Sequence, residues 1–211
     1  MGFFKRVGNE IVFVRAALRS LKKLKEIRAD ASHTFSDKIE ELARTKPNNV
    51  AIYFEDRTLT YRQYNEEANK YARWMQEQGL GRGDVVALMM ENRPEYLVAW
   101  LGIVKAGGTA ALINTNLTKG PLAHCLNISG ADHLVLGAEL AENFSTASDH
   151  LERPMTVWTT GGQVQGANDL DAALAQLPGD SLPADIRKNV TQDDNALFIY
   201  RSLIHLRTCR P

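Results

Sequence analysis

From residue 33 onwards, short apolar runs alternate with longer segments in which apolar residues recur every three or four positions. The short runs predict strands and the longer segments predict helices. The predicted strands are Val50–Phe54, Thr58–Thr60, Asp84–Met90, Thr109–Ile113, Asp132–Leu136, Met155–Thr159 and Ala196–Tyr200. Because most of these strands are separated by a helix, parallel crossover connections are expected. The expected fold class is α/β, with a partial, doubly wound and mainly parallel sheet flanked by helices.

Several residues mark where the helices begin and end. Thr60 followed by Gln63 forms the capping-box pattern of a helix start, and Gly79 suits the end of that helix. Pro94 suits a first helical position, and because Glu95–Ala106 is apolar on nearly all sides, this helix should be buried. Further helices are expected at Phe35–Leu42, from Pro121 to Gly130, at Ala138–His150 and at Leu170–Leu177.

Residues 1–28 differ from the rest of the chain in charge. The whole chain has a formal net charge of zero, which gives no reason to expect nucleic acid as a partner. Residues 1–28 contain eight basic and two acidic residues, so this segment carries +6 and the remaining chain −6. Its apolar residues recur at helical spacing, which predicts a basic amphipathic helix that precedes the α/β domain. The apolar positions are Ile11, Val14, Leu18 and Leu21.

Two interpretations of this helix stay open. It could rest on an anionic lipid surface, which would give peripheral membrane contact through residues 1–28. It could equally pack on the domain with a solvated basic face. Arg15 and Arg19 interrupt the apolar run, so the segment is neither a convincing secretion signal nor a membrane span.

Candidate chemistry is sparse along the chain. Gly79, Gly81 and Gly83 resemble half of a dinucleotide-binding fingerprint, but they precede a predicted strand, whereas a phosphate loop follows one. A turn explains these glycines better. Lys105 stands near a helix C-terminus, and its charge is explained by the helix dipole there.

The remaining candidates also have structural explanations. His124 and Cys125 are adjacent, so on a helix they point about 100° apart and cannot act as a pair within one turn. Asp193-Asp194 could bind a metal, but an acidic turn before a strand is commonplace. Cys125 and Cys209 are the two cysteines, which argues against a disulfide scaffold or a zinc site and suits a reducing compartment. The sequence therefore assigns no catalytic, cofactor-binding or metal-binding residue.

Three stretches carry a resemblance to a known family. Thr58–Tyr64 resembles the first core motif of adenylate-forming (AMP-binding) enzymes, and Ile103–Ala110 resembles their second core motif. Many members continue with Asn-Pro, whereas this chain has Asn114-Thr115-Asn116 and then His124-Cys125-Leu126. That version is similar to the fatty-acid-transport-protein and very-long-chain acyl-CoA synthetase branch. The resemblance extends from about Phe35 to Tyr200.

The resemblance implies an acid–thiol ligase of the AMP-forming type. Such an enzyme joins a fatty carboxylate to the α-phosphate of ATP and then passes the acyl group to coenzyme A. ATP, Mg²⁺ and coenzyme A are the expected cofactors of the full-length family, and long-chain fatty acid and coenzyme A are its substrates. The implied role is fatty acid activation and uptake. The cysteine content favours a cytoplasmic location, and the lipid-surface interpretation of residues 1–28 would add a peripheral position on the inner face of a membrane.

The resemblance stops abruptly after Tyr200. The family continues there with a loop reading Thr-Ser-Gly-Thr-Thr-Gly-x-Pro-Lys, whose backbone N–H groups hold phosphates. Here Arg201–Pro211 has only Ser202 in register, and Leu203 and Ile204 replace small residues. We interpret residues 201–211 as the product of a frameshift or truncation, and a functional replacement tail is the alternative. The expected division is a basic helix at 1–30, the N-terminal part of an AMP-binding domain at 31–200, and a divergent tail at 201–211.

Two classes of function follow from these observations. One is a long-chain or very-long-chain fatty acyl-CoA synthetase fragment that is inactive as this chain. The other is a non-catalytic membrane-associated or interaction module. An aryl- or short-chain acid ligase is a third option, which Asn114-Thr115-Asn116 disfavours.

Overall fold

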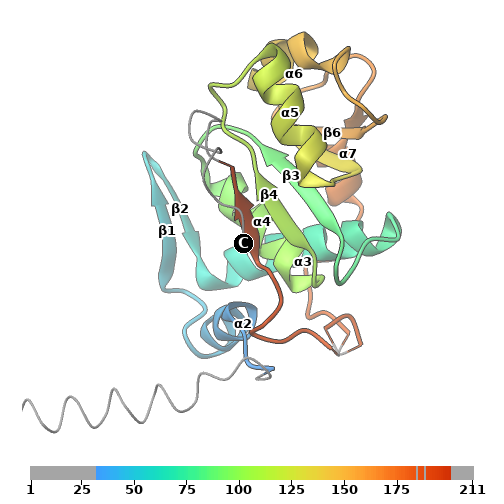
Figure 1. Ribbon diagram of the computed structural model, residues 1–211. Helices are drawn as coiled ribbons and strands as arrows, with labels where there is room; N and C mark the ends of the chain where they lie inside the picture. The colour runs from blue at the N-terminus through green and yellow to red at the C-terminus, as the bar shows by residue number, and fades with distance from the viewer. Residues whose placement is uncertain (1–31, 184, 188, 201–211) are drawn as a thin grey trace, which may run out of the picture.

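A six-stranded sheet forms the centre of the computed structural model, which describes residues 32–183, 185–187 and 189–200. Its strand order is β7-β6-β5-β3-β4-β8, and every neighbouring pair is parallel (Figure 1). The strands are β3 (Val85–Met89), β4 (Thr109–Leu112), β5 (His133–Gly137), β6 (Thr156–Thr160), β7 (Asn168–Asp169) and β8 (Leu197–Ile199). The parallel α/β architecture expected from the sequence is confirmed.

Helices cover both faces of this sheet, and a small hairpin lies beside it (Figure 1). The helices are α2 (Phe35–Thr45), α3 (Tyr61–Glu77), α4 (Pro94–Lys105), α5 (Lys119–Ser129), the 3-10 turn η1 (Ala138–Leu140), α6 (Ala141–Ser148) and α7 (Leu170–Ala175). The hairpin consists of β1 (Val50–Phe54) and β2 (Arg57–Thr60), which pair antiparallel. The chain enters α3 directly from β2.

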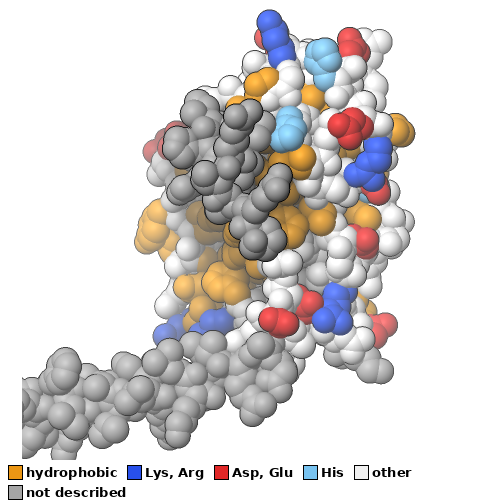
Figure 2. Space-filling model, viewed as in Figure 1, with side chains coloured by type: hydrophobic (Ala, Val, Ile, Leu, Met, Phe, Trp, Pro, Cys, Tyr) orange, Lys and Arg blue, Asp and Glu red, His pale blue; other side chains and the backbone are white. Residues whose placement is uncertain are grey.

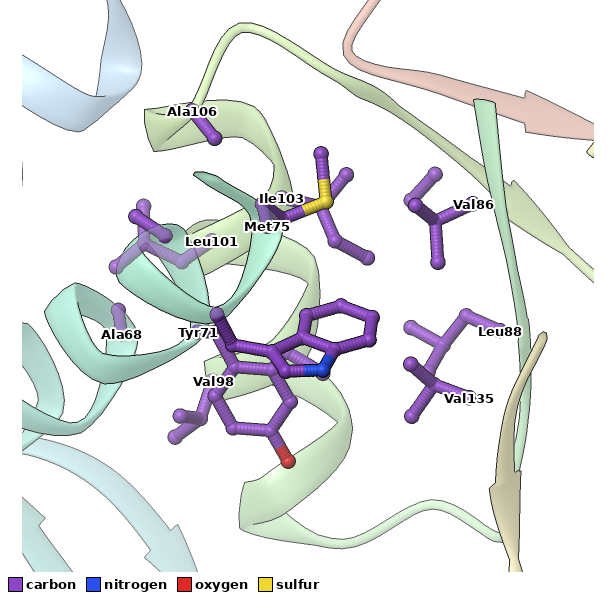
Figure 3. Packing of buried hydrophobic residues seen from close by; sticks show 14 of the residues in the cluster. Ala68, Tyr71, Met75, Val86, Leu88, Val98, Leu101, Ile103, Ala106 and Val135 are labelled. Atoms are coloured by element: carbon purple, nitrogen blue, oxygen red, sulfur yellow. The ribbon is translucent and has the colours of Figure 1, made fainter. Parts of the chain in front are cut away.

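Alternate residues of the central strand β3 face two separate cores. Val86 and Leu88 point to the side of α3 and α4, where they join one buried cluster (Figure 3). Ala87 and Met89 point to the side of α5 and α6, where they join the other. A strand that is buried on both faces is typical of a parallel sheet, because the crossover helices cover both sides. The connections therefore cross both faces of the sheet, as in a doubly wound α/β fold.

Trp74 holds α3 on the sheet. Its side chain is fully buried, and its ring meets Trp158 of β6 edge-on with centroids 5.4 Å apart. His133 of β5 lies on another side of the same indole, at 6.4 Å. Trp74 therefore joins α3 to two strands of the sheet, β5 and β6.

Most predicted element boundaries are confirmed to within one or two residues, with three differences. The segment expected as one helix at Ala138–His150 is split into η1 and α6, because Leu140, the last residue of η1, has φ of −108° and ψ of 10°, outside the α-helical range. Strand β7 was not predicted, since its two polar residues carry no apolar signal. In α4, which was expected to be buried all round, Leu97 is 41% exposed.

The predicted amphipathic helix in residues 1–30 and the divergent tail 201–211 lie outside the described residues. The division of the chain into three parts therefore stays a prediction. Over the stretches that are described, none of the helices has the length and apolar character needed to cross a membrane.

Candidate functional site

All six strands of the sheet point the same way, so their carboxyl ends share one edge. Parallel sheets bind ligands at this edge, at points where neighbouring strands lead to helices on opposite faces. Here β3 leads to α4 on one face and β5 leads to α6 on the other. The crevice between β3 and β5 is therefore the candidate ligand-binding position of this sheet.

Arg93 fills this crevice. Its Nη1 lies 3.4 Å from Glu139 Oε2, and its Nη2 donates to the carbonyl oxygen of Thr160 at 3.2 Å. The backbone N–H of Glu91 donates to the other oxygen of Glu139 at 3.0 Å. A Cβ at Gly161 would lie 2.8 Å from Arg93 Nη1, so the backbone of that turn approaches the guanidinium closely. Arg93, Glu139 and the backbone of Glu91 and Thr160 are thus bonded to one another where β3, β5 and β6 end.

Glu95 continues this network toward the hairpin. Its Oε1 accepts a hydrogen bond from Arg57 at 2.7 Å, while Oε2 faces Arg93 Nε at 3.9 Å. Burial alone would raise the pKa of Glu95, but the hydrogen bond and charge of Arg57 lower it overall. Oε2 of Glu95 and Nε of Arg93 are both buried and make no hydrogen bond. Their opposite charges, 3.9 Å apart, therefore compensate each other as an ion pair.

A cavity of about 430 Å³ lies next to Glu95, between the hairpin, α3, α4 and α7. Tyr71 and Val98 form part of its apolar floor, and Lys70 and Asp171 are on its wall. Both charges have partners, because Lys70 pairs with Glu67 at 2.8 Å and Asp171 accepts from Thr160 Oγ1 at 2.6 Å. The cavity is shaped mainly by helix packing and offers no free charge to a ligand.

The stretch after β4 that distinguishes the fatty-acid-transport branch forms a turn. The backbone N–H of Asn116 donates to Asn114 Oδ1 at 2.9 Å, which closes an Asx turn. Asn143 of α6 donates to the carbonyl oxygen of Thr115 at 2.9 Å and fixes the turn on the neighbouring helix. The Asn114-Thr115-Asn116 variant therefore sets how the chain passes from β4 into α5.

The second part of that signature lies in a core. Cys125 and Leu126 are buried in the cluster between α5 and the sheet, and burial raises the pKa of the Cys125 thiol. His124 is half-buried on the adjacent side of the helix, as its position in the sequence implies. A protonated, buried thiol acts as a packing group.

The explanation of Lys105 by the helix dipole is incomplete and is corrected by the structure. Its side chain is 0% exposed, and its Nζ contacts Asn65 Oδ1 at 2.6 Å, Asn69 Oδ1 at 2.6 Å and Glu40 Oε1 at 2.9 Å. Burial lowers the pKa of Lys105, and the hydrogen bond and charge of Glu40 oppose that effect. One sequence signal for this was available, because a lysine that ends an otherwise apolar helix is expected to need a buried partner.

The glycine and aspartate motifs have the structural roles expected from the sequence. Gly79 and Gly83 adopt φ of 72° and 93° in the turn before β3. Asp194 accepts from the backbone N–H of Thr191 at 2.7 Å and pairs with Arg82 at 3.0 Å. Among the residues that the structure describes, no three His, Cys, Asp or Glu side chains gather as metal ligands.

Several known proteins are similar to this chain in sequence or in fold. Long-chain fatty acid transport protein 2 of Rattus norvegicus is 31% identical over 95% of this chain and 32% of its own length. Bacitracin synthase 2 of Bacillus licheniformis is 31% identical over 82% of this chain and 6% of its own length. The fatty acyl CoA synthetase of Mycobacterium tuberculosis has a similar fold, with a TM-score of 0.66 and 27% identity over 79% of this chain and 32% of that one.

How much of each protein a match covers decides which conclusions it supports. The chain spans about a third of the length of the rat relative, so the activity of that whole protein does not pass to this chain by similarity alone. Residues 39–202 match the family described as AMP-binding enzyme, which is more than half of the chain. This chain belongs to the AMP-binding enzyme family.

Proposed function

We propose that this chain is part of an ATP-dependent, AMP-forming ligase that activates long-chain or very-long-chain fatty acids as coenzyme A thioesters during fatty acid uptake. Family membership supports the adenylate-forming reaction but not the choice of acid, because relatives with different products are equally identical to the chain. The Asn114-Thr115-Asn116 and His124-Cys125-Leu126 variants, which resemble the fatty acid branch, support that choice of acid.

The position of β8 is the observation that carries this proposal. β8 pairs in parallel with β4, with Leu112 opposite Ile199, so both strands deliver their next residues to the same edge of the sheet. In the family that the chain resembles, the phosphate-holding loop directly follows the strand that corresponds to β8. The resemblance therefore implies a phosphate loop at the edge where parallel sheets bind ligands, and this agreement supports the proposal.

The described residues do not themselves fit ATP, Mg²⁺ or coenzyme A. At the carboxyl edge, the polar side chains of Arg93, Glu139 and Asn114 are bonded within the protein. No metal-binding cluster occurs in the described ranges. We therefore derive no step through these groups and assign no catalytic residue to residues 32–200.

We further propose that the chain with its present residues 201–211 does not form acyl-adenylate. With Ser202 in register, Leu203 and Leu206 bring branched side chains where the family motif has glycine, and branched residues keep backbone N–H groups away from phosphates. A non-catalytic, membrane-associated role is the second candidate, and the +6 charge of residues 1–28 is the observation that favours it.

A chimera tests the proposed activity. Residues 35–200 replace the corresponding segment of the rat fatty acid transport protein, and thioester formation from oleate is compared with that from benzoate and alanine. We expect activity with the fatty acid alone. A matched chimera that also carries residues 201–211 should lose fatty-acid-dependent exchange of pyrophosphate into ATP. Exchange by that second chimera, or a preference for the aryl or amino acid in the first, would contradict the proposal.

A further inference from the structure

Two cations meet at one carboxylate oxygen on the side of the domain formed by α2, α3 and α4. Glu40 Oε1 lies 2.9 Å from Lys105 Nζ and 2.8 Å from Arg187 Nη1. Lys105 is 0% exposed and Arg187 is 16% exposed. Arg187 also pairs with Asp37, one turn earlier in α2. The two cations come from α4 and from the loop before β8, whereas both carboxylates come from α2.

Helix α2 has few apolar contacts to hold it in place. Ser36 and Ile39 are its buried residues. Phe35 stacks on Trp100 with ring centroids 5.3 Å apart, but it is 50% exposed. An isolated helix of 11 residues is marginal in water, so α2 depends on contacts with the rest of the domain. The ionic contacts of Glu40 and Asp37 therefore supply much of its attachment.

Solvent reaches this ionic contact through a cleft of about 790 Å³ between α2, α3 and residues 179–181. Asp37, Glu40 and Asn65 line the cleft, and the side chain of Glu40 is 39% exposed. A small ion could thus enter from solution if the side chain of Glu40 were shortened.

We propose that Lys105 and Arg187 form a carboxylate-binding site that the protein fills with its own Glu40, and that this contact is the latch that holds α2 on the domain. Removing the carboxylate leaves the Lys105 ammonium buried among Asn65 and Asn69 without a counter-charge. An uncompensated buried charge is strongly unfavourable. A free carboxylate ion that enters the emptied site restores the charge balance.

The chain offers a matched control beside Glu40. The side chain of Glu41 is 42% exposed, which is close to the 39% of Glu40, and its partner Lys38 lies on the same helix and is 51% exposed. Glu40→Ala and Glu41→Ala thus remove the same group from neighbouring positions of similar exposure. Glu40 joins α2 to other parts of the domain, whereas Glu41 pairs within α2.

The experiment compares hydrogen exchange of residues 35–45 in the whole chain and in both variants, with formate or chloride added at equal ionic strength. We expect Glu40→Ala to increase exchange of α2 by about tenfold or more and Glu41→Ala to leave it near the parent value. Formate should restore protection in Glu40→Ala, and chloride should not. Equal exchange in the two variants, or equal effects of the two salts, would overturn the proposal.

Glu40→Gln provides a second measurement. The amide keeps the shape of the side chain but not its charge, so α2 should loosen, and formate should not restore it because the site remains filled. If Glu40→Ala does not fold in chloride, its refolding yield in formate is measured instead. Folding that depends on formate supports the latch, and failure to fold in both salts overturns it.

Discussion

Asn69 connects the buried ammonium of Lys105 to a loop more than a hundred residues further along the chain. Its Oδ1 accepts from Lys105 Nζ at 2.6 Å, and its Nδ2 donates to the carbonyl oxygens of Gly179 and Asp180 at 2.9 Å each. Asn69 is 1% exposed. One amide thus satisfies a cation from α4 and two backbone carbonyl groups from the loop.

We expect Asn69→Leu to lower the free energy of unfolding by about 2–4 kcal/mol, because a buried donor and two carbonyl groups lose their partner. Urea unfolding followed by circular dichroism measures the change. Asn116→Leu is the control, since Asn116 is exposed and its turn is closed through its backbone N–H. A loss of similar size in both variants would mean that the Lys105 network is not the cause.

Gly102 sets the distance between α3 and α4. A Cβ at this position would lie 2.2 Å from the Cβ of Tyr71 and 2.7 Å from the carbonyl oxygen of Ala68. We expect Gly102→Ala to destabilise the domain by about 1–3 kcal/mol or more, although alanine favours helices, because the two backbones must move apart. Thermal unfolding measures this effect. Gly120→Ala, which meets nothing within 4 Å, should be neutral or better.

The sequence predicted the features that depend on neighbouring residues. The box of Thr60 and Gln63 is present, with each residue bonding the backbone of the other. The alternation of strands and helices correctly indicated a parallel sheet. The buried network of Lys105 was missed, since Glu40 lies 65 residues earlier and nothing local links the two. Asn69 was missed for the same reason, because a single asparagine on α3 gives no sign of a partner at residues 179–180.

Tyr71 is expected to make the folded domain less stable as the pH becomes alkaline. Burial raises the pKa of Tyr71 above its ordinary value of 10.0, with Asp171 and Glu95 acting in the same direction. A raised pKa in the folded protein contributes stability that is complete below pH 10 and is lost as the pH rises above it. The lowered pKa of Lys105 makes stability rise with pH instead. Because Lys105 is present in the parent chain and in every Tyr variant, its contribution cancels when their stabilities are compared.

We therefore expect Tyr71→Phe to reduce the loss of stability between about pH 10 and 12, measured as the urea midpoint at each pH. At neutral pH this variant should change stability little, because the Tyr71 hydroxyl is uncharged there in both the folded and the unfolded chain. Tyr53→Phe is the control, since Tyr53 is 78% exposed. An identical alkaline decline in all three proteins would show that the Tyr71 hydroxyl is not buried.

Strand β8 leads to a prediction about association. Among the described residues β8 pairs along one side only, and Ile199 is 70% exposed. Figure 2 shows hydrophobic side chains gathered on this face of the molecule. Unpaired strand edges with apolar side chains tend to pair with other chains. We expect the chain to self-associate, and Ile199→Lys to shift sedimentation toward the monomer. Ile128→Lys on α5, where the native residue is 52% exposed, should change little.

The charge of residues 1–28 leads to the last prediction, which concerns membranes. On an anionic surface each nearby basic residue contributes about 1 kcal/mol, and a buried apolar stripe adds a hydrophobic contribution. We therefore expect the chain to bind anionic vesicles more strongly than neutral ones, and added salt to weaken the binding. Replacing Leu18 and Leu21 with Asp should reduce binding even at low salt, because the hydrophobic contribution is lost and negative charge is added. Sedimentation of the chain with vesicles, beside a version without residues 1–28, makes the comparison direct. If both versions sediment to the same extent, residues 1–28 do not mediate the contact, and a helix that packs on the domain becomes the better explanation of their pattern.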